Sequence, residues 1–237
     1  MKAVITEKKE IAKGTLMVKL KLLDQRLNFD FKPGQFFLIK LINPPYNDEK
    51  GSQRYFSIVN SPKEKGILRF ATRLSESAFK KSLNQLAVGT EVEIDNVAGN
   101  FILPKNKLRP LVFIAGGIGI TPFVSMLSYV KEKNLYYGLT LIYSNRDKES
   151  TAFFDELQSI GKKARNAKVV FTMTQDPNWK GETRKIDAQF IKDYFQKPNS
   201  RTYMIAGPPP MVTAIVGSLK AAGVSEDNII TENFSGY

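Results

Sequence analysis

The chain has 237 residues, of which 35 are lysine or arginine and 23 are aspartate or glutamate, and it contains neither cysteine nor histidine. Without cysteine, this sequence can form no disulfide, thiolate nucleophile or cysteine-ligated iron–sulphur cluster. Without histidine, it lacks the usual base of hydrolytic triads and the commonest metal ligand, and we expect no metal site. Any redox chemistry must therefore reside on a bound organic cofactor or on a partner protein.

The formal net charge of +12 is uneven, because residues 1–110 carry 20 basic and 11 acidic side chains whereas residues 111–237 carry 15 and 12. Such an excess is typical of a solvated surface, but also of proteins that bind anionic cofactors, acidic proteins or nucleic acids. No nucleic-acid-binding motif accompanies the charge, so we expect no nucleic-acid partner. The sequence shows neither a signal-peptide core nor a bilayer-spanning apolar run, which predicts a cytoplasmic protein without a membrane partner. We also expect the protein to be a monomer.

The first hundred residues have the pattern of short antiparallel strands. Apolar and polar residues partly alternate at Met17–Leu23, Leu68–Thr72 and Glu91–Ile94, and proline and glycine turns separate these segments. This pattern predicts a small antiparallel barrel or sandwich. A helix is expected at Ser77–Leu86, where the serine side chain can cap the first turn.

From residue 111 onward, buried strands alternate with helices. The expected strands are Leu111–Ala115, Leu139–Tyr143, Val169–Met173 and Tyr203–Ala206. The expected helices are 122–133, 152–163, 187–195 and 210–222. This alternation predicts a doubly wound parallel α/β sheet. We place the division between an N-terminal domain, residues 1–105, and a C-terminal domain, residues 106–237.

A glycine-rich string, Gly116-Gly117-Ile118-Gly119-Ile120-Thr121-Pro122, directly follows the first buried strand. Glycines allow the backbone to approach a ligand closely, and Pro122 suits the first position of a helix, whose N-terminal amides attract phosphate. The string is not the G-x-G-x-x-G motif, because Pro122 replaces the third glycine. It indicates either a diphosphate site or simply a tight turn. A second segment, Ala206–Met211, also follows a strand, and ligands of doubly wound sheets bind beyond such carboxyl ends.

Two further segments carry chemistry-bearing residues. In Arg54-Tyr55-Phe56-Ser57, period-two alternation places Arg54 and Phe56 on one face, where they could hold a phosphate and stack on a flat ring, or simply belong to a core strand. The C-terminal stretch Thr231–Tyr237 carries a carboxylate and two aromatic residues. It is either a frayed tail or, because two isoleucines precede it, part of a last strand.

Taken together and in this order, these motifs resemble the ferredoxin–NADP reductase family of flavoproteins, from Phe31-Lys32-Pro33-Gly34-Gln35-Phe36 to Tyr237. The resemblance implies the stand-alone two-domain form without an iron–sulphur module. In that form an N-terminal antiparallel Greek-key β-barrel binds FAD, and a C-terminal α/β doubly wound parallel sheet binds NADPH or NADH.

The resemblance also implies roles for individual residues of the flavin site. Arg54 would pair with the flavin phosphates, Ser57 would hydrogen-bond the hydride-accepting nitrogen, and Phe56 would stack on the flavin ring in place of the usual tyrosine. The other flavin-binding positions that it implies are Tyr55, Phe70, Ala71, Thr72, Ser77, Ala78 and Phe79. The family's Gly-Pro-x-Gly segment appears here as Asn96–Gly99.

For the dinucleotide, the resemblance implies a site built from both glycine-containing segments and the residues after the second strand. Its positions are Gly116, Gly117, Gly119, Thr121, Pro122, Ser144, Asn145, Arg146, Ala206, Gly207, Pro208, Pro209 and Met211. Arg146 and Ser144 suit a 2′-phosphate, so we expect NADP rather than NAD. Ala206 stands where most of the family has a cysteine. Glu232, Phe234 and Tyr237 would border the flavin, with Tyr237 stacked on it, and Ser57, Glu232 and Tyr237 are the catalytic residues that we expect.

The implied function is hydride transfer from NADPH, or NADH, to bound FAD, followed by electron transfer to a separate acceptor. An acidic ferredoxin or flavodoxin would suit the basic N-terminal half. Three alternatives remain open at this point. They are an NAD(P)H:free flavin or quinone reductase, a non-enzymatic electron-relay or sensor subunit, and an anion-binding basic protein without a cofactor.

Overall fold

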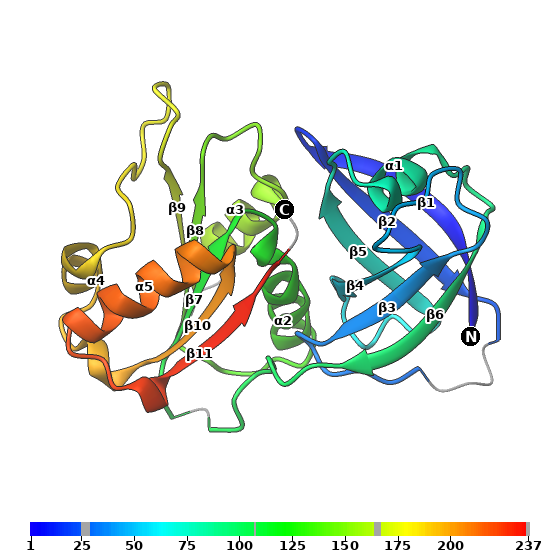
Figure 1. Ribbon diagram of the computed structural model, residues 1–237. Coiled ribbons are helices and arrows are strands. Elements are labelled where there is room, and N and C mark those ends of the chain that lie inside the picture. The colour runs from blue at the N-terminus through cyan, green and yellow to red at the C-terminus, as the bar shows by residue number, and fades with distance from the viewer. Residues whose placement is uncertain (25–28, 107, 164–166, 236–237) are drawn as a thin grey trace. The chain divides into compact units, whose positions relative to one another are not determined.

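The computed structural model describes residues 1–24, 29–106, 108–163 and 167–235. The chain forms two compact units, Met1–Leu103 with Thr121–Lys133, and Pro104–Ile120 with Asn134–Tyr237. The first unit is built on antiparallel strands and the second on parallel strands (Figure 1). In the described part of the chain, every helix is too short or too polar to cross a membrane.

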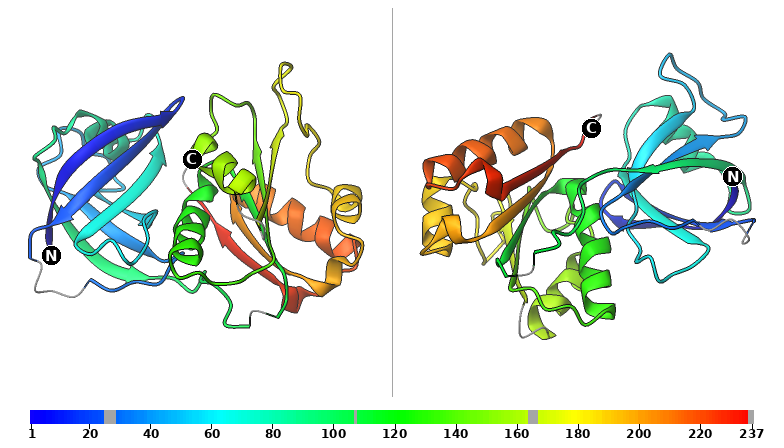
Figure 2. Two further views of the ribbon diagram at one scale, coloured as in Figure 1. Left: turned by 180° about the vertical axis from the view of Figure 1, so that it is seen from behind. Right: turned by 90° about the horizontal axis from the view of Figure 1, so that it is seen from below.

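The first unit contains a six-stranded antiparallel sheet with the strand order β4-β3-β6-β1-β2-β5. Its strands are β1 (Lys2–Ala12), β2 (Thr15–Leu22), β3 (Phe36–Leu41), β4 (Gln53–Ser57), β5 (Ile67–Arg73) and β6 (Glu91–Ala98). Just beyond β4, the backbone N–H of Val59 donates to the carbonyl of Arg69 on β5, at 2.8 Å. This bond joins the two ends of the strand order, and the sheet curls into a barrel (Figures 1 and 2). The predicted antiparallel barrel is confirmed.

The barrel core follows from the alternation of each strand. On β2, Val18 and Leu20 are fully buried while the lysine between them is more exposed, as period-two geometry requires. Across the interior, the rings of Phe37 and Phe70 meet edge to face at 5.8 Å. Helix α1 (Ala78–Gln85) packs its aromatic and leucine side chains into the same core. The expected serine cap is present, because the Ser77 side chain accepts from the third backbone N–H of the helix.

Helix α2 (Thr121–Glu132) packs with the barrel unit. The ring of Phe123 lies edge to face against Phe101 at 5.5 Å, and the Ser125 hydroxyl donates to the carbonyl of Asn60 at 2.8 Å. The sequence alternation assigned this helix to the C-terminal domain, whereas its contacts group it with the N-terminal one. The division that we predicted as a functional boundary therefore stays a prediction.

The second unit contains a five-stranded parallel sheet with the order β11-β10-β7-β8-β9. Its strands are β7 (Leu111–Gly116), β8 (Leu139–Asn145), β9 (Ala167–Met173), β10 (Thr202–Gly207) and β11 (Ile229–Asn233). The chain adds β8 and β9 on one side of β7, then returns to add β10 and β11 on the other side. The order thus reverses between β7 and β10, and doubly wound sheets bind ligands at the carboxyl ends of such a pair. The predicted doubly wound fold is confirmed.

Helices cover both faces of this sheet. Helices α4 (Ala188–Tyr194) and α5 (Pro209–Ala221) lie on one face and α3 (Phe154–Lys163) on the other (Figures 1 and 2). Short 3-10 turns are η1 (Gly117–Ile120), η2 (Pro198–Ser200) and η3 (Glu226–Asn228). Every residue of β7 is buried, as expected for the central strand of a sheet that is covered on both sides.

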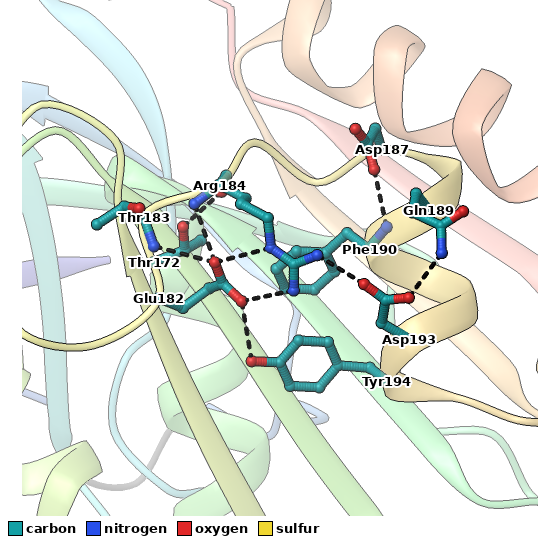
Figure 3. Close-up of polar contacts among 9 residues, drawn as sticks. All are labelled: Thr172, Glu182, Thr183, Arg184, Asp187, Gln189, Phe190, Asp193 and Tyr194. Carbon is teal, nitrogen blue, oxygen red and sulfur yellow. Dashed lines mark hydrogen bonds and ion pairs between the residues drawn. The ribbon is translucent and has the colours of Figure 1, made fainter.

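A polar cluster closes the outer edge of this sheet beside β9 (Figure 3). The Glu182 carboxylate accepts from Nε and Nη2 of Arg184 at 3.0 and 2.8 Å, and Arg184 Nη1 donates to Asp193 on α4 at 2.6 Å. The Thr172 hydroxyl on β9 donates to the Arg184 carbonyl at 2.6 Å. The arginine, chiefly through its hydrogen bonds, lowers the pKa of Glu182 to about 2. This cluster fixes the chain where it returns to the sheet after the excursion 174–181.

Candidate functional site

The glycine turn after β7 and the turn after β10 are packed tightly against each other. A Cβ atom at Gly116 would overlap the sulfur of Met211, and one at Gly119 would overlap the carbonyl of Ala206. Gly117 adopts a φ of +53°, in the left-handed region that favours glycine. The clash with backbone requires glycine at position 119 whether or not a ligand binds, and the positive φ favours it at 117, whereas at 116 the flexible Met211 side chain can move aside. The packing also places two turns side by side at the point where the strand order reverses.

The helical structure after β7 begins earlier than the sequence indicates. The 3-10 turn η1 starts at Gly117, and the hydroxyl of the buried Tyr143 donates to the Gly117 carbonyl at 2.9 Å. Pro122 is consequently the second residue of α2, not the first helical residue of the segment, which corrects our expectation. At the neighbouring turn, α5 opens with Pro209 and Pro210, which have no N–H. Amide donors for an anion must therefore come mainly from the glycine turn.

Glu232 lies at the same rim. In the parallel pairing of β10 and β11 it is the register partner of Ala206, and the N–H of Phe234 donates to the Gly207 carbonyl at 2.9 Å. The Glu232 Oε2 atom is buried without a hydrogen-bond partner, and this burial raises the pKa of the carboxyl group to about 7. A half-buried carboxyl group with one buried, unpaired oxygen at the end of a sheet is a candidate functional group.

The end of β8 is joined to a segment that the sequence did not single out. The carbonyl of Asn145 accepts from the N–H of Thr174 at 2.9 Å, and the carbonyl of Arg146 accepts from Gln175 at 2.8 Å. Arg146 is exposed, whereas the Asn145 side chain is buried with both amide atoms lacking partners. Thr174 and Gln175 follow β9 directly, so their position after a neighbouring parallel strand was the signal that could have found them.

In the barrel unit, the Arg54 side chain lies against helix α1. Its Nη1 donates to the carbonyls of Lys50 and Gly51 at 2.7 and 3.0 Å, and its guanidinium lies 5.3 Å from the centre of the Phe79 ring. Its Nη2 atom is buried and makes no hydrogen bond. The structure therefore holds a cationic donor with spare capacity next to the N-terminus of α1.

The three residues after Arg54 do not simply alternate. Tyr55 is 57% exposed and Phe56 only 9%, and Phe56 packs on Phe70 with ring centres 4.6 Å apart. Ser57 ends the strand and is also buried, although alternation pairs it with the exposed Tyr55. The exposed ring of this segment is therefore Tyr55, which contacts Phe36 edge to face at 5.3 Å. The stacking role of Phe56 stays a prediction.

The remaining predicted positions divide between buried and partly exposed residues. Phe70, Ala71 and Thr72 on β5 are buried, and their contact with a flavin stays a prediction. Ser77 and Ala78 are half-buried at the start of α1. Tyr237 lies outside the described residues.

The family follows from comparison with known proteins. Residues 2–102 match the oxidoreductase FAD-binding domain, and residues 113–217 match the oxidoreductase NAD-binding domain. The two matches follow each other in the order that the motifs predicted. The chain belongs to the ferredoxin–NADP reductase-type family of FAD- and NAD-binding oxidoreductases.

Several proteins of this type are similar to the chain. The γ subunit of sulfhydrogenase 1 from Pyrococcus furiosus is 29% identical over 84% of this chain and 66% of its own length. The electron transfer component of anthranilate 1,2-dioxygenase from Acinetobacter baylyi is 25% identical over 98% of this chain and again 66% of its own length. The chain thus spans about two-thirds of these relatives. A ferredoxin NADP+ reductase from Neisseria gonorrhoeae, solved with bound FAD and NADP, superimposes with a TM-score of 0.82 at 22% identity, covering 98% of both chains.

The residues present fit the two cofactors of this FAD- and NAD-binding family. Arg54 Nη2 is a buried donor that makes no hydrogen bond, although it forms an ion pair with Asp48 at 3.6 Å, and it lies beside a helix N-terminus, as a phosphate group requires. In the NAD-binding domain, a glycine turn leads into a helical turn at the reversal of strand order, where dinucleotides bind in doubly wound sheets.

Proposed function

We propose that this chain catalyses hydride transfer from NADPH, or NADH, to bound FAD and passes the electrons to a separate acceptor protein. The proposal is supported by a feature in each matched domain that suits a phosphate group. These features are Arg54 with the start of α1 in the FAD-binding domain, and the turn Gly116–Gly119 in the NAD-binding domain. We assign residues 1–105 and 106–237 to these two roles.

FAD, when bound, supplies the redox chemistry, because its ring system accepts a hydride and can pass electrons onward. The chain's own residues bind and orient it. Arg54 and the N–H groups at Ser77 and Ala78 hold the diphosphate, since a helix N-terminus favours negative charge. Ser57 offers its hydroxyl to the flavin ring, and Tyr55 and Phe56 supply aromatic surface. The backbone of 70–72 borders the adenosine end.

The nicotinamide dinucleotide is held by backbone more than by side chains. The turn Gly116–Gly119, with Thr121 and Pro122 following it, binds the diphosphate, and Gly207–Pro209 with Met211 contacts the nicotinamide end. Fixing both ends accelerates the reaction by orientation, which needs no acid or base from the protein. Ser144, Asn145 and Arg146 receive the adenosine ribose. The guanidinium of Arg146 favours a 2′-phosphate, and hence NADPH.

Glu232 holds a proton up to about neutral pH, so it would supply a proton donor at the carboxyl end of the parallel sheet once the cofactors are bound. Its neighbour Ala206 takes no part in proton or covalent chemistry. Phe234 and Tyr237 complete the proposed flavin surroundings, with Tyr237 stacked on the ring. A chain truncated before Tyr237 should show a changed flavin spectrum and a changed coenzyme affinity, and an unchanged pair of values would remove this role.

The acceptor that we propose is an acidic electron-carrier protein such as a ferredoxin or flavodoxin. Residues 1–110 carry 20 basic and 11 acidic side chains, and complementary charge speeds the encounter of such partners. A relative is named as an electron transfer component, which supports a separate acceptor. One alternative function is the reduction of free flavin or of a quinone. A second alternative is a non-enzymatic flavoprotein subunit that relays electrons or acts as a sensor.

The test reconstitutes the purified chain with FAD and follows oxidation of NADPH and NADH with three acceptors: ferricyanide, free FMN and an acidic ferredoxin. We expect turnover with ferricyanide, and turnover with ferredoxin that falls steeply as ionic strength rises. Salt-independent turnover that is fast only with free FMN would support the first alternative. FAD binding without oxidation of either coenzyme would support the relay.

A further inference from the structure

The N-terminus of α1 already holds an anion from the chain itself. The Asp48 carboxylate accepts from the N–H of Ala78 at 3.1 Å through Oδ2. Its Oδ1 lies 3.6 Å from Nη2 of Arg54, the donor that makes no hydrogen bond. The carboxylate therefore lies between the two groups that the proposed function assigns to the FAD diphosphate.

The loop that carries Asp48 is built to keep it there. In the turn 48–51, the N–H of Gly51 donates to the Asp48 carbonyl and the N–H of Lys50 donates to Asp48 Oδ1, both at 2.9 Å. Arg54 Nη1 in turn donates to the Lys50 and Gly51 carbonyls. The same loop is fixed on α1 by Tyr46, whose backbone N–H donates to the Ser82 hydroxyl at 3.0 Å. The position of the carboxylate is thus set by the fold of the loop.

Cationic groups lie around this carboxylate, together with two further acidic side chains, Glu49 next to Asp48 and Glu76, which pairs with Lys81. Arg54 and the helix N-terminus contribute positive potential, and the buried Lys80 adds a second cationic side chain in the first turn of α1. Burial, with a smaller contribution from Arg54, lowers the pKa of Lys80. A carboxylate and a diphosphate cannot accept from the same N–H, and two anions a few ångströms apart repel each other.

We propose that Asp48 is an internal competitor of the FAD diphosphate, one that lowers the affinity of the protein for FAD and accelerates FAD release. This inference rests on the proposed function, since it assumes that FAD binds at Arg54 and α1. When FAD enters, the carboxylate leaves the Ala78 N–H and the loop 48–51 shifts with it. Asp48 therefore tunes how firmly the flavin is retained, without contacting the reacting atoms.

The test compares wild-type protein with Asp48→Asn, because asparagine keeps an oxygen acceptor for the Lys50 N–H and removes the charge. The dissociation constant and the release rate are measured from flavin fluorescence, for FAD and for riboflavin, which lacks the diphosphate. We expect Asp48→Asn to bind FAD about tenfold more tightly and to release it more slowly. Riboflavin affinity should change by less than about twofold, because no anion enters the site.

The matched control is Asp30→Asn, which removes the same charge from the same unit at an exposed ion pair with Lys65. We expect no change in FAD affinity for this variant, since the charge lies outside the α1 site. Asp48→Ser, checked by circular dichroism, serves if the asparagine variant does not fold. Unchanged or weaker FAD binding by folded Asp48 variants, or an equal gain in Asp30→Asn, would overturn the inference. If neither wild type nor variant binds FAD, the proposed function fails with it, whereas FAD binding that ignores Asp48 overturns the inference alone.

Discussion

Glu232 lies directly across from Ala206 in the parallel pairing of β10 and β11, and its Oε2 atom is buried without a hydrogen-bond partner. A methyl side chain at position 206 offers neither a donor nor a charge to stabilise the carboxylate. Burial therefore raises the pKa of Glu232 to about 7. The chain keeps an acidic group that holds its proton up to neutral pH at the carboxyl end of its parallel sheet.

The raised pKa of Glu232 makes stability depend on pH. The folded chain binds this proton more tightly than the unfolded chain, so the contribution is full below the ordinary value of 4.5 and is lost as the pH rises through about 7. Glu232→Gln removes this loss. Between pH 5 and pH 8, the variant should gain about 2 kcal/mol over wild type in the free energy of unfolding. Urea unfolding at both pH values measures the gain.

A control for this prediction is Glu226→Gln. Glu226 is paired with Lys220, and its pKa is lowered, chiefly by the hydrogen bond to that lysine. The contribution of Glu226 to stability therefore changes only at pH values below the ordinary carboxyl pKa. The free energy of unfolding of Glu226→Gln relative to wild type should stay constant from pH 5 to pH 8. A difference in unfolding free energy between Glu232→Gln and wild type that stays constant over the same pH range would show that the pKa of Glu232 is not raised in the folded chain.

Alanine substitutions at two glycines should change stability in opposite directions, one through a steric clash and the other through helix propensity. In Gly119→Ala the new Cβ would overlap the Ala206 carbonyl, so the variant should lose at least about 2 kcal/mol of stability. Its affinity for NAD(P)H should fall, while its affinity for FAD is retained. Gly217→Ala, on α5, adds a Cβ that meets nothing within 4 Å and should gain about 0.5 to 1 kcal/mol. Equal effects of the two substitutions in thermal unfolding would contradict the tight contact of the two turns.

We expect Arg146 to determine the preference of the protein for NADPH over NADH. Arg146→Gln should raise the KM for NADPH about tenfold and change that for NADH by less than about twofold, because only NADPH offers a 2′-phosphate to the guanidinium. Lys148→Gln, which removes a neighbouring charge whose ammonium group lies 4.8 Å from the Phe154 ring, is the control. A wild-type preference for NADH, or equal rises for both coenzymes, would be against this role.

The cluster around Glu182 gives a stability signature in acid. The pKa of Glu182 is lowered to about 2, so its contribution is complete above the ordinary value of 4.5 and is lost as the pH falls through about 2. Arg184→Met should therefore destabilise the chain at pH 7, and its deficit relative to wild type should shrink as the pH approaches 2. Lys220→Met, which breaks an exposed pair, should cost less at pH 7. A deficit of Arg184→Met that is independent of pH would contradict the link between Arg184 and Glu182.

Local pattern predicted most of the fold, for physical reasons that particular elements show. The wholly apolar run that became β7 and the capped helix α1 are specified by their own residues, through hydrophobic periodicity and a serine cap. The grouping of α2 with the barrel was not predicted, because it depends on the contact of Phe123 with Phe101. A local sequence pattern does not show which distant segment such a residue will contact.

The sequence predicted which motifs contribute to the site, but not which other residues contact them. The sequence pointed to Arg54, but not to Asp48, which reaches the α1 N-terminus from a loop thirty positions before Ala78. Likewise it pointed to Arg146, but not to Gln175, which arrives from the end of the adjacent strand. The residue types indicate which chemistry a site can carry. The neighbours that modify the properties of those residues are distant in the sequence, and tertiary packing brings them together.

The proposed transfer of hydride from NADPH to bound FAD is tested most simply by an anaerobic absorbance titration of the purified chain. We predict that the protein binds FAD, shows the yellow flavin spectrum, and loses that absorbance when one equivalent of NADPH is added, with NADH less effective. A protein that stays colourless after incubation with FAD, or a yellow protein that neither coenzyme bleaches, would contradict it.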